Sequence, residues 1–352
     1  MFAMKGRLAS ALMAGGLALA AATAAAAQEK VVLKVVGTWG NLSNWTKVEQ
    51  PFWNETLPKA SNGMITAQAS PQTELGLKGF EIMRLLKLGV FDVAHALPIY
   101  IAEDATVEGM DLAGVARDFA TARKITEAYE PVLAKALEEQ YNAKLLNQYP
   151  FPSQIFYCNK PIDGIESLAG RKIRVQGASQ GDFVEGLGAN PVTIAFAEVV
   201  PSLQKGVVDC GITGTMPAYK AKWHEVATHA FPLRVGFTVT FTAINMNSWN
   251  KLDPKAQETL LKASAEFEDN AWKVIEAEDQ EGIFCSTGTG PCSVGEPADM
   301  TLVEPTDKDF EARDRILRDV VLKRWAQRCG ADCAERWNET VGKVVGLTAS
   351  GS

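Results

Sequence analysis

The sequence predicts an α/β protein with two lobes and one long helix that spans both of them. Strand and helix patterns alternate over residues 31–96 and again over residues 154–210, which indicates two sheets covered by helices. A strand pattern at 237–245 follows the second unit and should return to the first. A helical pattern then runs without interruption from Pro254 to about Gly282.

Length and composition set the class of protein. A chain of 352 residues is long enough for two domains. Hydrophobic residues make up 47% and charged residues 22%, which is ordinary for a globular protein and excludes a disordered chain, a collagen-like fibre and a coiled-coil rod. The chain has 35 Lys and Arg against 42 Asp and Glu, a net charge of -7. This balance offers no basic surface for DNA or RNA, so we expect no nucleic-acid partner.

The first 27 residues predict a cleaved signal peptide. Lys5 and Arg7 precede an uncharged stretch, Leu8 to Ala22, and three alanines at 25–27 offer a cleavage site. The uncharged stretch is shorter than the roughly 20 residues that a membrane-spanning helix needs. A membrane anchor is the alternative, but this pattern favours export with cleavage near Ala27.

Each predicted unit has its own strands and helices. The first unit should contain strands at 31–36, 64–69, 90–96 and 143–149 and helices at 44–60, 79–88 and 120–141. The second should contain strands at 154–159, 172–175, 192 and 207–210 and helices at 181–187 and 198–205, before a helical pair at 307–327 and 334–345. We therefore place lobe I at 28–150 and 238–280, and lobe II at 151–237 and 281–352.

The long helix is the element that should join the lobes. At 1.5 Å per residue its predicted length is about 42 Å. That is longer than one small α/β domain is wide, since such a domain has a radius of gyration of roughly 13–15 Å. A helix lying across both lobes is the simplest explanation, and a surface helix on one lobe is the alternative.

The six cysteines all follow the predicted signal peptide. An even number of cysteines in an exported chain indicates disulfides, here Cys285 with Cys292 and Cys329 with Cys333. A four-cysteine zinc site is the alternative, but its pairs usually enclose two to four residues, and the first pair encloses six. Cys158 and Cys210 remain, either as a third pair or as two buried thiols.

The sequence contains none of the common enzyme motifs that we searched for. The three histidines do not form a metal-binding motif, and the nucleophile elbow and the phosphate-binding loop are both missing. Gly288 and Gly290 form a lone Gly-x-Gly inside a cysteine loop, not after a strand, so they do not predict a dinucleotide site. We expect no enzyme activity and no cofactor; a secreted enzyme with an unrecognised site is the alternative.

Five segments carry a specific resemblance. They read Gln-Thr-Glu-Leu-Gly (72–76), Leu-Gly-Val-Phe-Asp (88–92), Leu-Ala-Gly-Arg-Lys-Ile-Arg-Val (168–175), Leu-Gly-Ala (187–189) and Phe-Ala-Glu-Val-Val-Pro-Ser-Leu-Gln-Lys-Gly-Val-Val-Asp (196–209). Together they closely resemble the extracytoplasmic solute receptors of tripartite ATP-independent periplasmic (TRAP) transporters. The resemblance implies a two-lobe periplasmic solute-binding protein that captures a small organic acid and delivers it to an ion-gradient-driven permease. We expect a monomer; a receptor for a signalling partner is the alternative.

The same resemblance implies that Arg174 binds the ligand carboxylate. A guanidinium group offers a planar fork of donors that matches a carboxylate, and burial in a closed cleft strengthens the pair. Gln154 and Thr213 occupy positions where sugar-acid receptors often have Arg and Asn, so a second cation is not expected. These neutral donors could still complete a carboxylate or keto-oxygen site, and Phe196 should pack beside the carboxylate.

The first lobe should supply an apolar wall. Trp39 and Trp45 follow the first strand, and His95 and Leu97 lie at the end of the third. The carboxyl ends of strands are where open α/β sheets bind ligands. Trp39, His95 and Leu97 are therefore candidate ligand contacts, whereas Trp45 could equally belong to the core. The resemblance implies acidic residues at this rim in sugar-acid receptors, and these are missing here. The apolar, aromatic wall therefore favours a weakly hydroxylated monocarboxylate.

Overall fold

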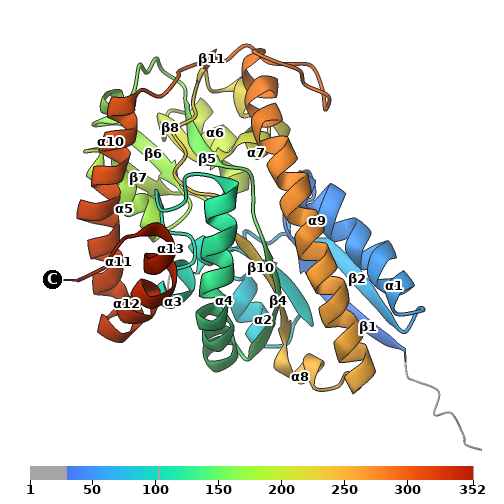
Figure 1. The fold of residues 1–352 in the computed structure, drawn as a ribbon. Coiled ribbons are helices and arrows are strands. Elements are labelled where there is room, and N and C mark those ends of the chain that lie inside the picture. Colours follow the sequence, from blue (N-terminus) through green and yellow to red (C-terminus); the bar gives the residue numbers. More distant parts are fainter. Residues whose placement is uncertain (1–29, 102–103, 352) are drawn as a thin grey trace, which may run out of the picture.

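A computed structural model describes residues 30–101 and 104–351 of the chain (Figure 1). The predicted signal peptide, residues 1–27, lies outside the described residues. The described chain forms two lobes, each built on its own sheet. The strand order is β2-β1-β3-β10-β4 in the five-stranded sheet and β11-β9-β5-β8-β6-β7 in the six-stranded sheet. The two-lobe α/β architecture predicted from the sequence is thus confirmed.

The five-stranded sheet forms the centre of the first lobe. Its strands are β1 (Val31–Gly37), β2 (Ile65–Pro71), β3 (Val93–Ala96), β4 (Ala143–Tyr149) and β10 (Thr240–Asn245). β1 runs parallel to β2 and β3, and β10 lies antiparallel between β3 and β4. The chain therefore returns to the first sheet after the second has been built, as its alternating pattern predicted.

The six-stranded sheet forms the centre of the second lobe. Its strands are β5 (Gln154–Cys158), β6 (Lys172–Val175), β7 (Asn190–Thr193), β8 (Cys210–Gly214), β9 (His229–Phe231) and β11 (Thr301–Leu302). β8 begins where the sequence had placed its end, so the prediction of a strand at 207–210 was wrong. The Thr and Gly residues there pair along the whole of β5, and this pairing outweighs their local turn preference.

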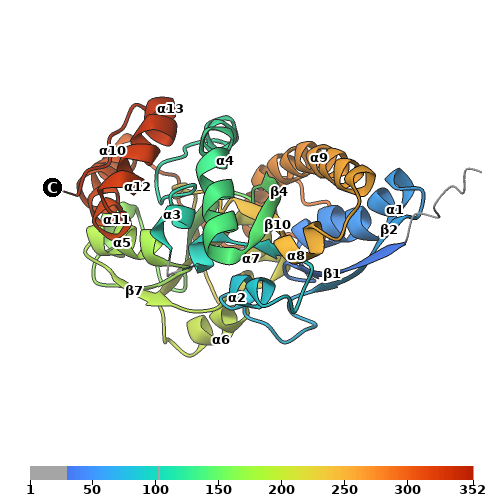
Figure 2. The ribbon, with the colours of Figure 1, turned by 90° about the horizontal axis from the view of Figure 1, so that it is seen from below.

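Helices cover both sheets (Figures 1 and 2). Before β8, a helical segment over 44–60 ends in α1 (Leu57–Ala60) and is followed by α2 (Ile82–Lys87), α3 (Ala105–Glu108), α4 (Phe119–Tyr141), α5 (Ala178–Gly186) and α6 (Val199–Gln204). The chain after β8 contributes α7 (Thr215–Lys220), α8 (Met246–Trp249), α9 (Pro254–Thr287), α10 (Asp307–Ile316), α11 (Leu322–Cys329), α12 (Ala331–Trp337) and α13 (Lys343–Val345). Within residues 30–101 and 104–351, no helix combines the length and apolar character needed to cross a membrane.

The helix α9 spans the two lobes (Figure 1). It begins where the Asp253 side chain accepts hydrogen bonds from the first backbone N–H groups, and it ends at Gly288, which has a positive φ of 68°. Its 34 residues measure about 51 Å. It packs against β4 of the first lobe and α7 of the second. The prediction that one long helix lies across both lobes is confirmed.

Two crossing segments and α9 form the junction between the lobes. The segment from β4 to β5 meets the segment from β9 to β10, where the Phe151 N–H donates to the Phe237 carbonyl at 3.0 Å. Asp279 of α9 accepts hydrogen bonds from the Ser153 N–H and hydroxyl at 2.7 and 2.6 Å, and it pairs with Arg234 at 3.1 Å. The helix is therefore bonded to both crossing segments.

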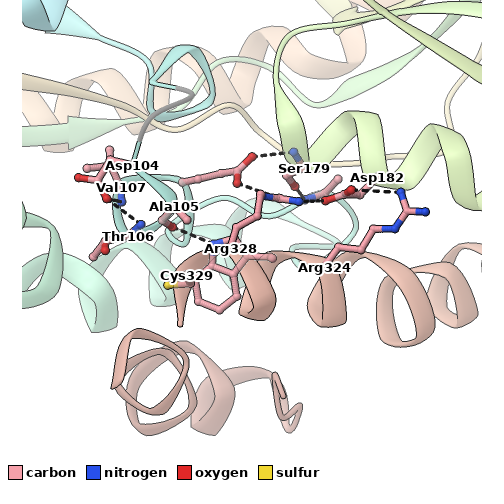
Figure 3. A network of polar contacts seen from close by, with 12 residues as sticks. Asp104, Ala105, Thr106, Val107, Ser179, Asp182, Arg324, Arg328 and Cys329 are labelled. Atoms are coloured by element: carbon pink, nitrogen blue, oxygen red, sulfur yellow. Dashed lines mark hydrogen bonds and ion pairs between the residues drawn. The ribbon is translucent and has the colours of Figure 1, made fainter. Parts of the chain in front are cut away.

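The C-terminal helices contact both lobes. The indole N–H of Trp325 donates to the Ala105 carbonyl at 2.8 Å. Arg328 of α11 binds Glu108 of α3 at 3.2 Å and Asp182 of α5 at 2.6 Å, so it connects a helix of the first lobe to one of the second (Figure 3). The assignment of 281–352 to lobe II stays a prediction, and these contacts show that the segment also touches the first lobe.

All six cysteines are paired. Disulfides join Cys285 to Cys292 and Cys329 to Cys333, as expected, and a third joins Cys158 of β5 to Cys210 of β8. Of the two alternatives left open for Cys158 and Cys210, the structure shows the pair. These two residues lie opposite each other on β5 and β8, so their disulfide links two neighbouring strands of the second sheet.

We expect all three disulfides in protein prepared from an oxidising compartment, because such bonds form and persist there. Peptide mapping by mass spectrometry without reduction should find the links 158–210, 285–292 and 329–333. A chelator should leave the melting temperature unchanged. Detection of bound zinc, or of free thiols at these positions, would contradict this pairing.

Candidate functional site

A small pocket lies between the lobes. It is lined by residues that follow strands of both sheets and by residues of the crossing segments: Trp39, Leu42, Leu97, Tyr100, Phe151, Gln154, Gln176, Phe196, Thr213, Gly214, Pro217 and Thr238. Five of the predicted ligand contacts lie on this wall, namely Trp39, Leu97, Gln154, Phe196 and Thr213. Arg174 lies behind the wall, and His95 lies elsewhere.

Aromatic rings from both lobes form one side of the pocket. Trp39 meets Tyr100, Phe151 and Phe196 edge to face, with ring centroids 5.9, 6.0 and 5.4 Å apart. Phe196 in turn stacks on Trp223 of the second lobe at 6.0 Å. Such packing holds the rings in place and offers an apolar surface to a flat ligand.

Neutral amides that hydrogen-bond to one another also line the pocket. The Gln176 amide nitrogen donates to the Gln154 side-chain oxygen at 2.6 Å, and the Gln154 amide nitrogen donates to the Pro152 carbonyl at 2.9 Å. The Gln176 backbone N–H is bound by Gln180 at 3.0 Å. These amides are buried and already hydrogen-bonded, so they present oriented dipoles without a charge.

Arg174 is fully buried on β6 and lacks an acidic partner among the described residues. Its Nε donates to the Ile194 carbonyl at 2.9 Å and its Nη1 to the Ile212 carbonyl at 2.7 Å. Its Nη2 lies 3.4 Å from the Tyr100 hydroxyl. Burial lowers the pKa of the Arg174 guanidinium, although the group stays charged. A fixed and desolvated cation of this kind is suited to bind an anion.

The Tyr100 hydroxyl lies between Arg174 and the pocket. Tyr100 follows β3 of the first lobe and lines the pocket, whereas Arg174 does not. Burial raises the pKa of the Tyr100 phenol, so the group is neutral at ordinary pH. The arginine of the second lobe is thus in contact with a neutral oxygen from the first.

His95 belongs to the core of the first lobe. The Trp53 indole N–H donates to His95 Nε2 at 2.7 Å, so His95 carries its proton on Nδ1, which lies 2.7 Å from the Tyr149 hydroxyl. Burial lowers the pKa of His95 to about 3, and the ring is neutral. The structure does not bring His95 to the pocket, because it is an inner residue of β3 whose side chain contacts Trp53. Trp45 is also buried away from the pocket, against Gly37.

The network around His95 ends at Glu49, which should make stability depend on pH. Glu49 accepts from Thr38 and from the Tyr149 hydroxyl, yet burial still raises its pKa to about 7. Since the folded-state pKa is above the unfolded value, the stabilisation is present below pH 4.5 and is lost as pH rises through about 7. Between pH 5 and 8 we expect Glu49 to lower the free energy of unfolding by about 2–3 kcal/mol.

The Glu49→Gln variant tests this expectation. Urea unfolding at pH 5 and pH 8 should give a smaller difference in the variant than in the wild type. Glu281→Gln is the control, because Ser293 hydrogen bonds lower the pKa of Glu281, so its removal should not flatten the same slope. Equal slopes for Glu49→Gln and the wild type would contradict the role of Glu49.

Sequence reasoning missed several residues of the pocket. Tyr100 lies three residues beyond Leu97, on a short turn after β3. Gln176 follows Arg174 by two positions at the end of β6, and Thr238 lies in the second crossing segment. Gln176 could have been found from its place at the strand end. Tyr100 and Thr238 depend on how the lobes meet, which no local pattern reveals.

The fold and this pocket define a class of protein: a two-lobe receptor that binds a solute between its lobes. The family model described as "Bacterial extracellular solute-binding protein, family 7" (DctP) matches residues 36–290. The chain belongs to this family, and it is an extracytoplasmic solute receptor of the TRAP type.

Individual relatives agree with this assignment. The C4-dicarboxylate-binding periplasmic protein DctP of Rhodobacter capsulatus is 25% identical over 306 residues, which cover 84% of this chain and 85% of that protein. The solved structure of DctP7, a Bordetella pertussis extracytoplasmic solute receptor binding pyroglutamic acid, has a TM-score of 0.77 at 20% identity and covers 88% of this chain and 99% of its own. A TRAP solute-binding protein of Desulfovibrio salexigens with bound orotic acid gives 0.79 at 17% identity, covering 90% and 100%. At these identities the two structures show the fold alone.

Proposed function

We propose that the protein captures a small organic monocarboxylate between its lobes and delivers it to an ion-gradient-driven TRAP permease. The observation that carries this proposal is the burial of Arg174 against neutral partners only. A buried cation without a counter-charge is costly, and a carboxylate bound to its free N–H groups would offset that cost. The burial of Arg174 without a counter-charge therefore supports its predicted role in binding the ligand carboxylate.

The lining of the pocket favours one carboxylate over two. Among the described residues that line it, none has a charged side chain. A second carboxylate would meet the amides of Gln154 and Gln176 or the hydroxyl of Thr213, without a second cation. These groups suit a keto, lactam or hydroxyl oxygen, because each is neutral and can donate or accept a hydrogen bond.

The relatives point to candidate ligands. Pyroglutamic acid and orotic acid, bound by the two solved receptors, each have one carboxyl group on a small ring. The aromatic wall of Trp39 and Phe196 would pack against such a ring. The C4-dicarboxylates named for the Rhodobacter protein are the competing class.

A thermal-shift screen tests the ligand class. Pyroglutamate, orotate and lactate should be compared with succinate and with pyroglutamide, the uncharged analogue of pyroglutamate. A bound ligand raises stability by RT ln(1 + [L]/Kd), so a monocarboxylate should raise the melting temperature in proportion to the logarithm of its concentration. Larger shifts with succinate, or equal shifts with pyroglutamide, would overturn the proposal. Recovery of the ligand unchanged after long incubation would separate a receptor from an enzyme.

Export and delivery complete the proposal. We infer that the chain is exported to the periplasm, cleaved near Ala27, and active as a monomer. N-terminal sequencing of protein from the periplasm should begin at Gln28. A strain that lacks this receptor but keeps its permease should lose uptake of the labelled ligand and regain it with the wild-type chain. Uptake that persists without the receptor would rule out this role.

A further inference from the structure

We propose that Tyr100 competes with the ligand: its hydroxyl holds the edge of Arg174 that the ligand carboxylate needs, and it is displaced when the carboxylate binds. The inference rests on the proposed function and assigns to Tyr100 a role in affinity and specificity.

The position of the Tyr100 oxygen is the first support. It accepts from the Arg174 Nη2 at 3.4 Å, and it is the one side-chain oxygen among the described residues that binds this nitrogen. An arginine N–H group is a donor that a carboxylate oxygen binds more strongly than a phenol oxygen does. Because Tyr100 lines the pocket and Arg174 does not, a ligand meets the phenol before it meets the guanidinium.

The weakness of the contact is the second support. Hydrogen bonds from N–H to oxygen are usually 2.7–3.2 Å long, and the Arg174–Tyr100 distance exceeds that range. A carboxylate would form a charge-assisted bond of about 2.7–2.9 Å with the same donor. Replacing the Tyr100 hydroxyl on Arg174 with a ligand oxygen therefore favours a carboxylate. A neutral amide would only replace one weak hydrogen bond to Arg174 with another.

The surroundings of the ring couple this exchange to lobe movement. Phe80 stacks on the Tyr100 ring with centroids 4.4 Å apart, and a Cβ on Gly79 would lie 2.6 Å from the ring, so the segment 78–80 rests directly on it. Lys78 of the same segment pairs with Glu198, two residues beyond Phe196, at 2.5 Å. Tyr100 and this segment belong to the first lobe, and Arg174 belongs to the second. Displacement of the hydroxyl thus breaks one contact between the lobes, that of Tyr100 with Arg174, while the pair of Lys78 and Glu198 remains.

The variant Tyr100→Phe tests the proposal, since it keeps the ring and removes only the oxygen. Calorimetry with pyroglutamate and lactate should show about three- to tenfold tighter binding than in the wild type, because a net hydrogen bond that opposed binding is gone. If the hydroxyl instead stays in place and donates to the ligand, affinity will fall. Lower or unchanged affinity would overturn the competition.

Two controls keep the test interpretable. Tyr129→Phe also removes a buried phenol oxygen, one that donates to the Thr106 carbonyl far from the pocket, and it should leave affinity unchanged. Circular dichroism of Tyr100→Phe should show a folded protein. Binding to the wild type with no gain in Tyr100→Phe would refute only the competition. A wild type that binds neither these probes nor orotate would refute the proposed function as well.

Discussion

Replacing Arg174 with Ala should weaken monocarboxylate binding by about 3–5 kcal/mol, because it removes a charge-assisted contact in a desolvated cleft. Arg174→Lys should recover only part of the loss, since an ammonium group keeps the charge but lacks the planar fork. Calorimetry with the monocarboxylate that gives the largest thermal shift is the measurement. Near-native affinity in Arg174→Ala would refute the assignment of this residue.

Arg171→Ala is the matched control for Arg174. The Arg171 side chain also donates to backbone carbonyls, with its Nε 2.7 Å from the Ser167 oxygen, but it does so near the surface. Its removal should leave affinity unchanged. Because Arg174→Ala strips the Ile194 and Ile212 carbonyls of a donor, its free energy of unfolding should be measured beside Arg174→Lys, which keeps a donor there.

Replacing Gly177 with Ala should lower affinity by about 10- to 100-fold. Gly177 is the N-cap residue that precedes α5 in the second lobe, and a Cβ there would lie 2.0 Å from the carbonyl oxygen of Ile99 in the first lobe. Forcing extra volume into such a contact costs about 1–3 kcal/mol, and each 1.4 kcal/mol is tenfold in affinity. The lobes can avoid the clash only by opening, so the closed, ligand-bound form is the form that loses stability.

Gly181→Ala, in the same helix, is the control for Gly177. A Cβ on Gly181 would meet only Pro191, at an ordinary 3.9 Å, and Ala favours a helix more than Gly does. This variant should bind as the wild type does. Small-angle scattering at saturating ligand should show a larger radius of gyration for Gly177→Ala than for Gly181→Ala. Equal affinity and equal size for the two variants would contradict a closing movement at this contact.

Sequence patterns predicted the bounds of strands best where the residues favour a strand on their own and the packing of the fold requires one as well. The strands at 143–149 and 172–175 have the predicted bounds, because runs of strand-forming residues end at clear turns. The strand β8 was misplaced, since its Thr and Gly residues become a strand only through pairing with β5. In the site, Trp39 was found from its place after the first strand, and Thr213 was found from the resemblance to solute receptors. Tyr100 was missed because its approach to Arg174 arises from the meeting of two lobes.

The hydrogen bonds that hold α9 in place show which positions would suit fluorescent labels in an optical sensor for the ligand. The helix is held to the first lobe by Trp272, which donates to the Gln148 carbonyl at 3.1 Å, and to the crossing segment by Asp279. Two fluorophores on its exposed face, at Lys255 and Lys273, keep a fixed separation and serve as the reference pair. A donor at Leu88 and an acceptor at Val207, both exposed and on different lobes, would report capture of the solute as a change in energy transfer.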